Sequence, residues 1–264
     1  MLARYGLRVV ALGYLAMLLL VPVGMIVYHT FSSYGVGPVW NAMTQPDAIA
    51  ALELTLKVAL IAVPLNTVFG IVFALMMVRS NIPGKAFLNA LVDLPFAVSP
   101  VVVGFTLILV YGQNGWFGQW FVDHGYPIIF STPGIVLATI FVSLPFVARE
   151  VIPVLREIGT EQEEAATTIG ATGWQTFWRI TLPSIRWGVV YGIVLTTARA
   201  IGEFGAVAVV SGSVIGQTQT LTLTVDSAYT NFNPVGAYAA ALELAAIAMC
   251  TLFVMNLIKP RRKT

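Results

Sequence analysis

Residues 164–183 read EAATTIGATGWQTFWRITLP and form the centre of segment 149–186, the longest stretch between two apolar runs of the chain. Glycine readily adopts the left-handed backbone that ends many helices, and proline cannot continue a helix in the ordinary way. Gly170 is therefore placed to end a first short helix, and Pro183 to stop a second. The segment is predicted to form a helix, a glycine turn and another helix.

Two capping patterns in this segment support the same prediction. Thr160 with Glu163 and Thr172 with Gln175 both follow the T-x-x-E/Q pattern. In such a capping box, the two side chains satisfy each other's backbone N–H groups at a helix start. Each of the two short helices is therefore expected to begin at a box.

The chain around this segment is too apolar for a water-soluble domain. Of its 264 residues, 58% are hydrophobic and only 10% are charged, against roughly 25% charged residues in soluble domains. The mean hydropathy is +0.85. Cys250 is the single cysteine, which excludes an internal disulfide and a cysteine-rich metal site. Most of the protein surface is expected to face lipid.

Six apolar stretches have the length of a membrane span, which is about 20 residues for a helix. Pro95, Pro100 and Pro133 fall in the third and fourth stretches and predict helices that are bent or broken there. We therefore expect an all-α integral membrane protein with six transmembrane helices in a single domain, residues 1–264. The predicted spans are residues 9–28, 58–78, 87–111, 128–148, 187–210 and 235–258.

The basic residues predict the orientation, because Lys and Arg near span ends are retained on the cytoplasmic side. The loops 29–52, 112–127 and 211–234 contain no Lys or Arg. Six spans place both termini and segment 149–186 in the cytoplasm. The first span is expected to be a retained helix, since its apolar run of about 20 residues exceeds the roughly 7–15 of a signal peptide. Twelve of the 14 basic residues then share one side: Arg4, Arg8, Arg79, Lys85, Arg149, Arg156, Arg179, Arg186, Lys259, Arg261, Arg262 and Lys263.

The spacing EAA-x3-G-x9-I-x-LP in segment 149–186 resembles the EAA loop of the permease subunits of ATP-binding-cassette (ABC) importers. The resemblance implies that a short coupling helix docks in a groove of a cytoplasmic ATPase. Small alanines permit close approach of a partner, and Glu164 offers a charged contact. A capped helix pair at the membrane surface is the alternative, but the fixed spacing of the whole motif favours the importer. The motif residues are Glu164, Ala165, Ala166, Gly170, Ile180, Leu182 and Pro183.

A narrower resemblance extends over most of the chain. Residues 174–178, 187–191 and 198–207 are similar to the sulfate and thiosulfate importer permeases. Residues 210–225 are similar to one subunit type of these importers in particular, and the first span and loop 29–52 match least. Molybdate permeases share the EAA loop and a related GEFG segment, so a permease for molybdate or another oxyanion is the alternative.

The resemblance implies a type I ABC importer permease in the inner (plasma) membrane of a prokaryote, surrounded by the lipid bilayer. The partners it implies are two ABC ATPase subunits, a second and different permease subunit, and an external sulfate-binding protein. No cofactor, metal or nucleic acid is expected. The chain contains no G-x-x-x-x-G-K-[ST] loop, so ATP hydrolysis is expected on another polypeptide.

Arg199 and Glu203 lie four residues apart within the fifth predicted span and can pair. An Arg at the bilayer centre costs about 2.5–3.5 kcal/mol on insertion scales, so the pair is expected to face protein or water. It either forms part of a translocation gate or holds the fifth helix to its neighbours. The resemblance assigns to the same gate Phe204, Gly205, Ser99 and Pro100.

Other polar residues in or near the spans are expected to have structural rather than transport roles. Asp93 is expected to be a structural cap or a ligand of the helix break, Glu243 to hydrogen-bond a neighbouring helix, and Lys57 to reach toward an interface. His29 and His124 are expected to stand alone in external loops.

The external charges favour delivery of the substrate by a separate receptor. Asp47, Asp123 and Asp226 fall on the predicted external face, whose loops contain no Lys or Arg, so this face would not concentrate a dianion. An ion-coupled transporter acting alone is less favoured, because it leaves the EAA loop unexplained. An intramembrane enzyme is disfavoured, because the chain has no H-E-x-x-H or nucleophile motif.

Overall fold

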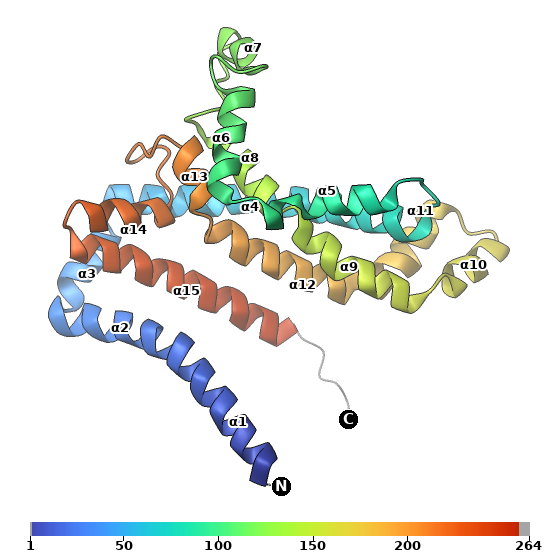
Figure 1. The fold of residues 1–264 in the computed structure, drawn as a ribbon, viewed down its shortest axis with the longest axis horizontal. Coiled ribbons are helices and arrows are strands. Elements are labelled where there is room, and N and C mark those ends of the chain that lie inside the picture. The colour runs from blue at the N-terminus through green and yellow to red at the C-terminus, as the bar shows by residue number, and fades with distance from the viewer. Residues whose placement is uncertain (1, 259–264) are drawn as a thin grey trace.

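The computed structural model describes residues 2–258, and over this range its regular structure is helical, with no strand (Figure 1). Single π-helical turns, η1 and η2, interrupt two of the helices. The elements are α1 Leu2–Leu15, η1 Ala16–Leu20, α2 Val21–Ser33, α3 Val36–Met43, α4 Pro46–Arg79, α5 Lys85–Ala97, α6 Pro100–Tyr111, α7 Gly118–Asp123, α8 Thr132–Ser143, α9 Pro145–Ile158, α10 Glu161–Thr168, α11 Gly173–Thr176, η2 Phe177–Thr181, α12 Leu182–Ile201, α13 Gly205–Val210, α14 Leu221–Thr230 and α15 Pro234–Ile258.

The apolar helices agree with the expected number of spans. Five continuous helical runs in the described residues are long and apolar enough to cross a membrane, and a bent helix pair makes up to six. The bent pair is α5 with α6, whose axes meet at 109°. The helix that contains the predicted second span is longer than that span, since α4 begins at Pro46 rather than at residue 58. The continuous runs are Gly6–Ser33, Pro46–Arg79, Thr132–Ile158, Gly173–Ile201 and Pro234–Thr251.

The prolines act differently in the third and fourth spans. Pro100 is the first residue of α6, and Ser99 before it has the extended backbone (φ −59°, ψ 134°) that a following proline favours. This confirms the predicted break of the third span. Pro133 instead lies in the first turn of α8, where a missing N–H costs nothing. The bend predicted at Pro133 is therefore wrong, and helix α8 begins just before it, at Thr132.

The fifth span differs from the prediction at both of its ends. The continuous span predicted over 187–210 is wrong, because α12 ends at Ile201 and α13 begins at Gly205. Pro183 does not stop a helix either, since the helical run continues from Gly173 to Ile201. A proline cannot bond the carbonyl one turn before it and its ring clashes there. The π turn Phe177–Thr181 widens the backbone at that place and accommodates the proline.

The centre of the bundle is the contact of α4, α9 and α12 around Val147, which is fully buried. A Cβ atom on Gly70 of α4 would lie 2.6 Å from Val147 Cβ, and one on Gly192 of α12 would lie 2.7 Å from Val147 Cα. Small residues let helix backbones approach closely in membranes. These two glycines therefore fix how near α4 and α12 come to α9.

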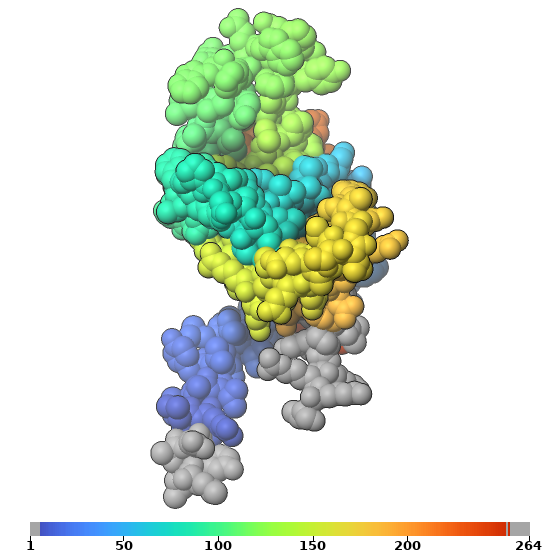
Figure 2. Space-filling model, turned by 90° about the vertical axis from the view of Figure 1, so that its right-hand side faces the viewer, coloured from blue at the N-terminus to red at the C-terminus, as the bar shows by residue number. Residues whose placement is uncertain are grey.

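The N-terminal helices stand away from this bundle. In the span Gly6–Ser33 none of the most apolar window is buried, and the space-filling view shows this arm projecting from the body (Figure 2). Helix α2 approaches the rest of the chain at α15 and α3. The N-terminal end of α1 and the C-terminal end of α15 point to the same side of the molecule (Figure 1). Lys259, Arg261, Arg262 and Lys263, which support the predicted topology, lie outside the described residues.

Candidate functional site

The turn between the two short helices of segment 149–186 is built as the sequence predicts. Helix α10 ends at Thr168, and Gly170 has a φ of +89°. The Gly170 N–H bonds the Thr167 carbonyl at 3.0 Å, and the Ala171 N–H bonds the Ala166 carbonyl at 3.0 Å. These are the two hydrogen bonds of a Schellman motif. The prediction that Gly170 ends the first helix is confirmed.

Only the second of the two predicted capping boxes forms. The Gln175 N–H bonds Thr172 Oγ1 at 3.4 Å, and the Thr172 N–H bonds Gln175 Oε1 at 2.9 Å. At the first box, Thr160 Oγ1 donates instead to Glu164 Oε1 at 2.6 Å, and Thr160 makes no capping hydrogen bond. The predicted box at Thr160 and Glu163 is wrong, because the Glu163 carboxylate takes a charged partner.

That partner is Arg79, the last residue of α4. Its Nε lies 2.8 Å from Glu163 Oε2, and Thr181 Oγ1 of η2 donates to Glu163 Oε1 at 2.8 Å. In this pair both partners are charged, whereas in a capping box the carboxylate would bond an uncharged backbone N–H. Arg79 and Glu163 lie 84 positions apart, so no local sequence pattern indicated this contact.

The motif residues of segment 149–186 divide between a surface and the interior. Glu164 and Ala165 are exposed, and Ala166 packs inward with 5% of its surface accessible. Ile180 and Leu182 are half-buried, and Pro183 is exposed in the first turn of α12. The exposed surface continues over Gly170 to two large apolar side chains that the motif does not include, Ile169 at 87% and Trp174 at 71% exposed.

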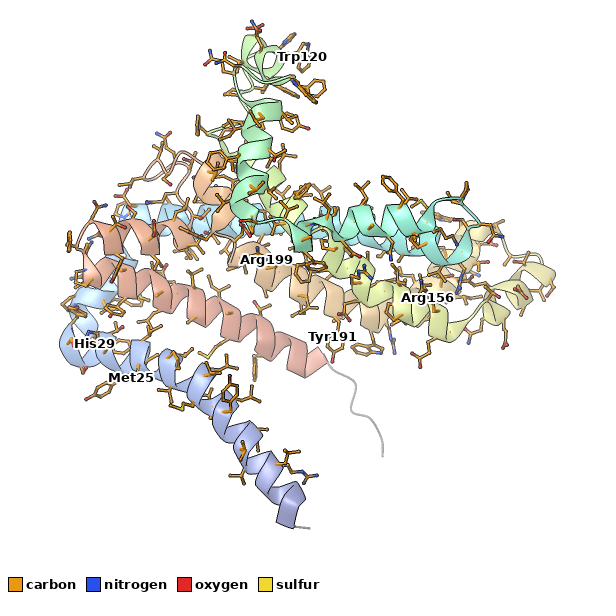
Figure 3. All side chains as sticks on the ribbon, in the orientation of Figure 1. Met25, His29, Trp120, Arg156, Tyr191 and Arg199 are labelled. Atoms are coloured by element: carbon orange, nitrogen blue, oxygen red, sulfur yellow. The ribbon has the colours of Figure 1, made fainter. Side chains whose placement is uncertain are left out.

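Arg199 and Glu203 form the expected ion pair, with Arg199 Nη2 2.7 Å from Glu203 Oε2. The Glu203 side chain is 1% exposed and that of Arg199 is 32% exposed. Glu203 Oε1 also accepts the Ala206 N–H at 2.9 Å, so the carboxylate caps the start of α13. Figure 3 shows Arg199 near the end of α12. One carboxylate thus connects the two helices on either side of the break.

Two helix breaks meet beside this pair. A Cβ atom on Gly205 would lie 3.0 Å from Pro100 Cβ, so the start of α13 contacts the start of α6. Ser99 is exposed at the break that precedes α6. Phe204 is 41% exposed and lines a cavity of about 480 Å³. The other lining residues include Ile26, Thr222, Asp226, Tyr229 and Tyr238.

Asp93 has a different role from the expected cap. Arg149 of α9 donates through Nε to Asp93 Oδ1 at 2.7 Å, and its Nη2 contacts the other carboxylate oxygen. Asp93 therefore links α5 to α9. Glu243 does not make the expected hydrogen bond through Oε2, which is buried without a partner among the described residues. Lys57 is exposed on α4, as a side chain that reaches toward the membrane interface would be.

The two histidines do not stand alone in loops. His29 lies in α2, with its ring centroid 5.3 Å from that of Tyr238, and His124 ends α7 and stacks on Trp120 at 4.3 Å. Figure 3 shows His29 and Trp120 at separate ends of the molecule. In the part of the chain that the structure describes, no three His, Cys, Asp or Glu side chains gather in a way that could hold a metal ion.

Comparisons with known proteins agree with this architecture. Residues 66–264 match the family described as "Binding-protein-dependent transport system inner membrane component". The chain is 52% identical to the sulfate transport system permease protein CysW of Synechocystis sp., over 98% of this chain and 93% of the relative. It is 36% identical to the sulfate transport system permease protein CysT of Escherichia coli (strain K12), over 95% of this chain and 90% of the relative.

A solved structure shares the fold at low sequence identity. A chain of a bacterial alginate ABC transporter, crystallised in complex with an alginate pentasaccharide-bound periplasmic protein, superposes with a TM-score of 0.79 at 18% identity. The match covers 98% of this chain and 94% of that one. The overall helical arrangement is therefore one that an ABC transporter uses.

Proposed function

Because the chain belongs to the family of binding-protein-dependent transport system inner membrane components, we propose that it forms part of the path by which sulfate crosses a prokaryotic inner membrane. The assignment of sulfate as the substrate rests on the 52% identity to a sulfate permease over 98% of the chain. The family match and the sulfate permease relatives indicate a permease subunit, with ATP hydrolysis on a separate ATPase subunit. Thiosulfate is a second proposed substrate, since it is also a tetrahedral dianion.

The whole chain, residues 1–264, serves as one transmembrane domain with the cytoplasmic EAA segment at 149–186. Its permease partner is a different chain, and the similarity to CysT supports this pairing because CysT is a sulfate permease of another sequence. An external sulfate-binding protein delivers the anion. The lack of Lys and Arg in loops 29–52, 112–127 and 211–234 supports such delivery.

One of two ABC ATPase subunits docks on the exposed face of α10 and the turn that follows. Glu164, Ala165 and Gly170 shape this face, and Ala166 packs beneath it. Ile180, Leu182 and Pro183 join the face to α12. The exposure of Ile169 and Trp174 supports docking, because large apolar side chains at a solvent-facing turn are typical of protein contacts.

Arg199 and Glu203 belong to the gate of the translocation path, together with Phe204, Gly205, Ser99 and Pro100. The support is geometric: a buried ion pair stands where α12 breaks, and the break at Gly205 contacts the break at Pro100. Helix breaks in membranes occur where protein or a cavity satisfies the backbone. A movement of either break therefore displaces the other.

The test is uptake into proteoliposomes that contain this chain, a second permease, the ATPase and the receptor. Labelled sulfate should enter only with ATP and receptor, and excess thiosulfate should compete. Stronger competition by molybdate than by thiosulfate would favour the molybdate alternative. Uptake by the chain alone without ATP would overturn the proposal and support an ion-coupled transporter.

A further inference from the structure

The docking helix α10 is held to the rest of the chain by little apolar packing. Among its residues only Ala166 is buried, and its main neighbours are α11 and η2. Both of its chain connections pass through glycines with positive φ, Gly159 at +65° and Gly170 at +89°. Glycine imposes little restriction on backbone rotation. The covalent connections alone therefore fix the orientation of α10 poorly.

Arg79 bridges the first of these connections from outside. Its Nη1 donates to the Leu155 carbonyl at 3.3 Å, on the α9 side of Gly159, and its Nη2 donates to the Gly159 carbonyl itself. On the α10 side its Nε donates to Glu163 at 2.8 Å. One side chain thus binds α9, the glycine connection and α10 together.

The chemistry of the guanidinium suits this position. Carbonyls at a helix C-terminus lack intrahelical partners and attract a cation, and Leu155 and Gly159 stand at the end of α9. A guanidinium also presents its donors in a rigid fork, whereas a lysine ammonium is a point charge on a flexible stem. The side chains of Arg79 and Glu163 are only 18% and 20% exposed, so water screens the pair incompletely.

We propose that Arg79 is the positioning residue that transmits movement of the docking helix α10 to the transmembrane helices α4 and α9. The inference rests on the proposed function, in which an ATPase moves α10. Thr181 extends the same connection to α12, because it donates to the Glu163 carboxylate. Without Arg79, α10 remains docked on the ATPase but turns about Gly159, and ATP hydrolysis no longer drives the permease.

The test uses the full importer in proteoliposomes and compares Arg79→Gln, Arg79→Lys and wild type. Three quantities are measured: copurified ATPase, receptor-stimulated ATP hydrolysis and sulfate uptake. In Arg79→Gln the ATPase should copurify normally, and uptake per ATP hydrolysed should fall by about tenfold, within the range of measured coupling between sites. Arg79→Lys should be similarly defective, since one ammonium cannot hold Glu163 and both carbonyls. Arg156→Gln is the matched control, because Arg156 is an exposed arginine of α9 (Figure 3).

Three outcomes contradict the inference or its premise in distinguishable ways. Normal uptake per ATP in Arg79→Gln would refute transmission through Arg79. The inference would also be refuted if the ATPase copurified with wild type and with the control but not with Arg79→Gln, because Arg79 would then help to build the docking surface. A wild-type chain that binds no ATPase would instead refute the proposed function. If Arg79→Gln does not accumulate, Glu163→Gln carries the same expectation and the same refutation, since it keeps the side-chain shape.

Discussion

Arg199 and Glu203 pair across the end of a helix, with the guanidinium on the last turn of α12 and the carboxylate already beyond it. The spacing of four residues is that of a helical pair, yet the backbone leaves the helix after Ile201. Beyond the helix end, the Glu203 carboxylate is held in place because its second oxygen accepts the Ala206 N–H. The pair therefore joins two helices, which an ordinary i, i+4 pair does not.

The substitution Glu203→Gln should separate a gate from a structural pair. The amide oxygen can still accept the Ala206 N–H, whereas the ion pair with Arg199 is lost. For a gate, sulfate transport per assembled complex should change more than the yield of complex. An unchanged transport value with only a reduced yield would refute the gate.

A structural pair gives a different pattern in the reciprocal substitution. Arg199→Gln leaves the buried Glu203 carboxylate without its cation, which costs about 3 kcal/mol in comparable buried pairs. For a purely structural pair, both single variants should lose yield and the double variant should recover it. Subunit yield in membranes, quantified by immunoblot, measures this.

Gly170→Val should abolish sulfate uptake while the chain still inserts in the membrane. No atom would contact an added Cβ at Gly170, so the effect comes from its φ of +89°. Left-handed backbone costs an ordinary residue about 1–2 kcal/mol, and a β-branched residue is more restricted still. Gly173→Ala is the control, because Gly173 lies nearby in equally open space without a positive φ. Normal uptake with normal ATPase association in Gly170→Val would contradict the docking assignment.

Gly192→Leu should destabilise the bundle by about 1–3 kcal/mol, the usual cost of overpacking a core. The reason is that even a Cβ there would lie 2.7 Å from Val147 Cα. The melting temperature of the purified chain should fall, whereas Gly24→Leu should leave it unchanged, since nothing lies within 4 Å of that position. Equal melting temperatures for the two variants would contradict the close approach of α12 to α9.

A reporter fused after Thr264 should be active only if it functions in the cytoplasm. The expectation follows from the basic residues and holds for both termini. Because Thr264 lies outside the described residues, this test depends on the sequence alone. Strong activity of an export-dependent reporter at this position would reverse the topology and place segment 149–186 outside the cell.

Local features were predictable from the sequence because their causes lie within a few residues. The length of each apolar run sets whether a helix can span a bilayer, and the described helices agree with that expectation. The Schellman turn at Gly170 and the box at Thr172 involve partners at most five residues apart. The break at Pro100 likewise follows from the clash of a proline with the residue before it.

Where the same local signal led to different structures, tertiary contacts decided which one formed. The box at Thr160 obeys the same pattern as that at Thr172, but Arg79 takes Glu163 from it. A guanidinium delivered by a helix 84 positions away binds the carboxylate more strongly than a backbone N–H does. Only the folding of α4 against α9 brings that charge to the docking helix.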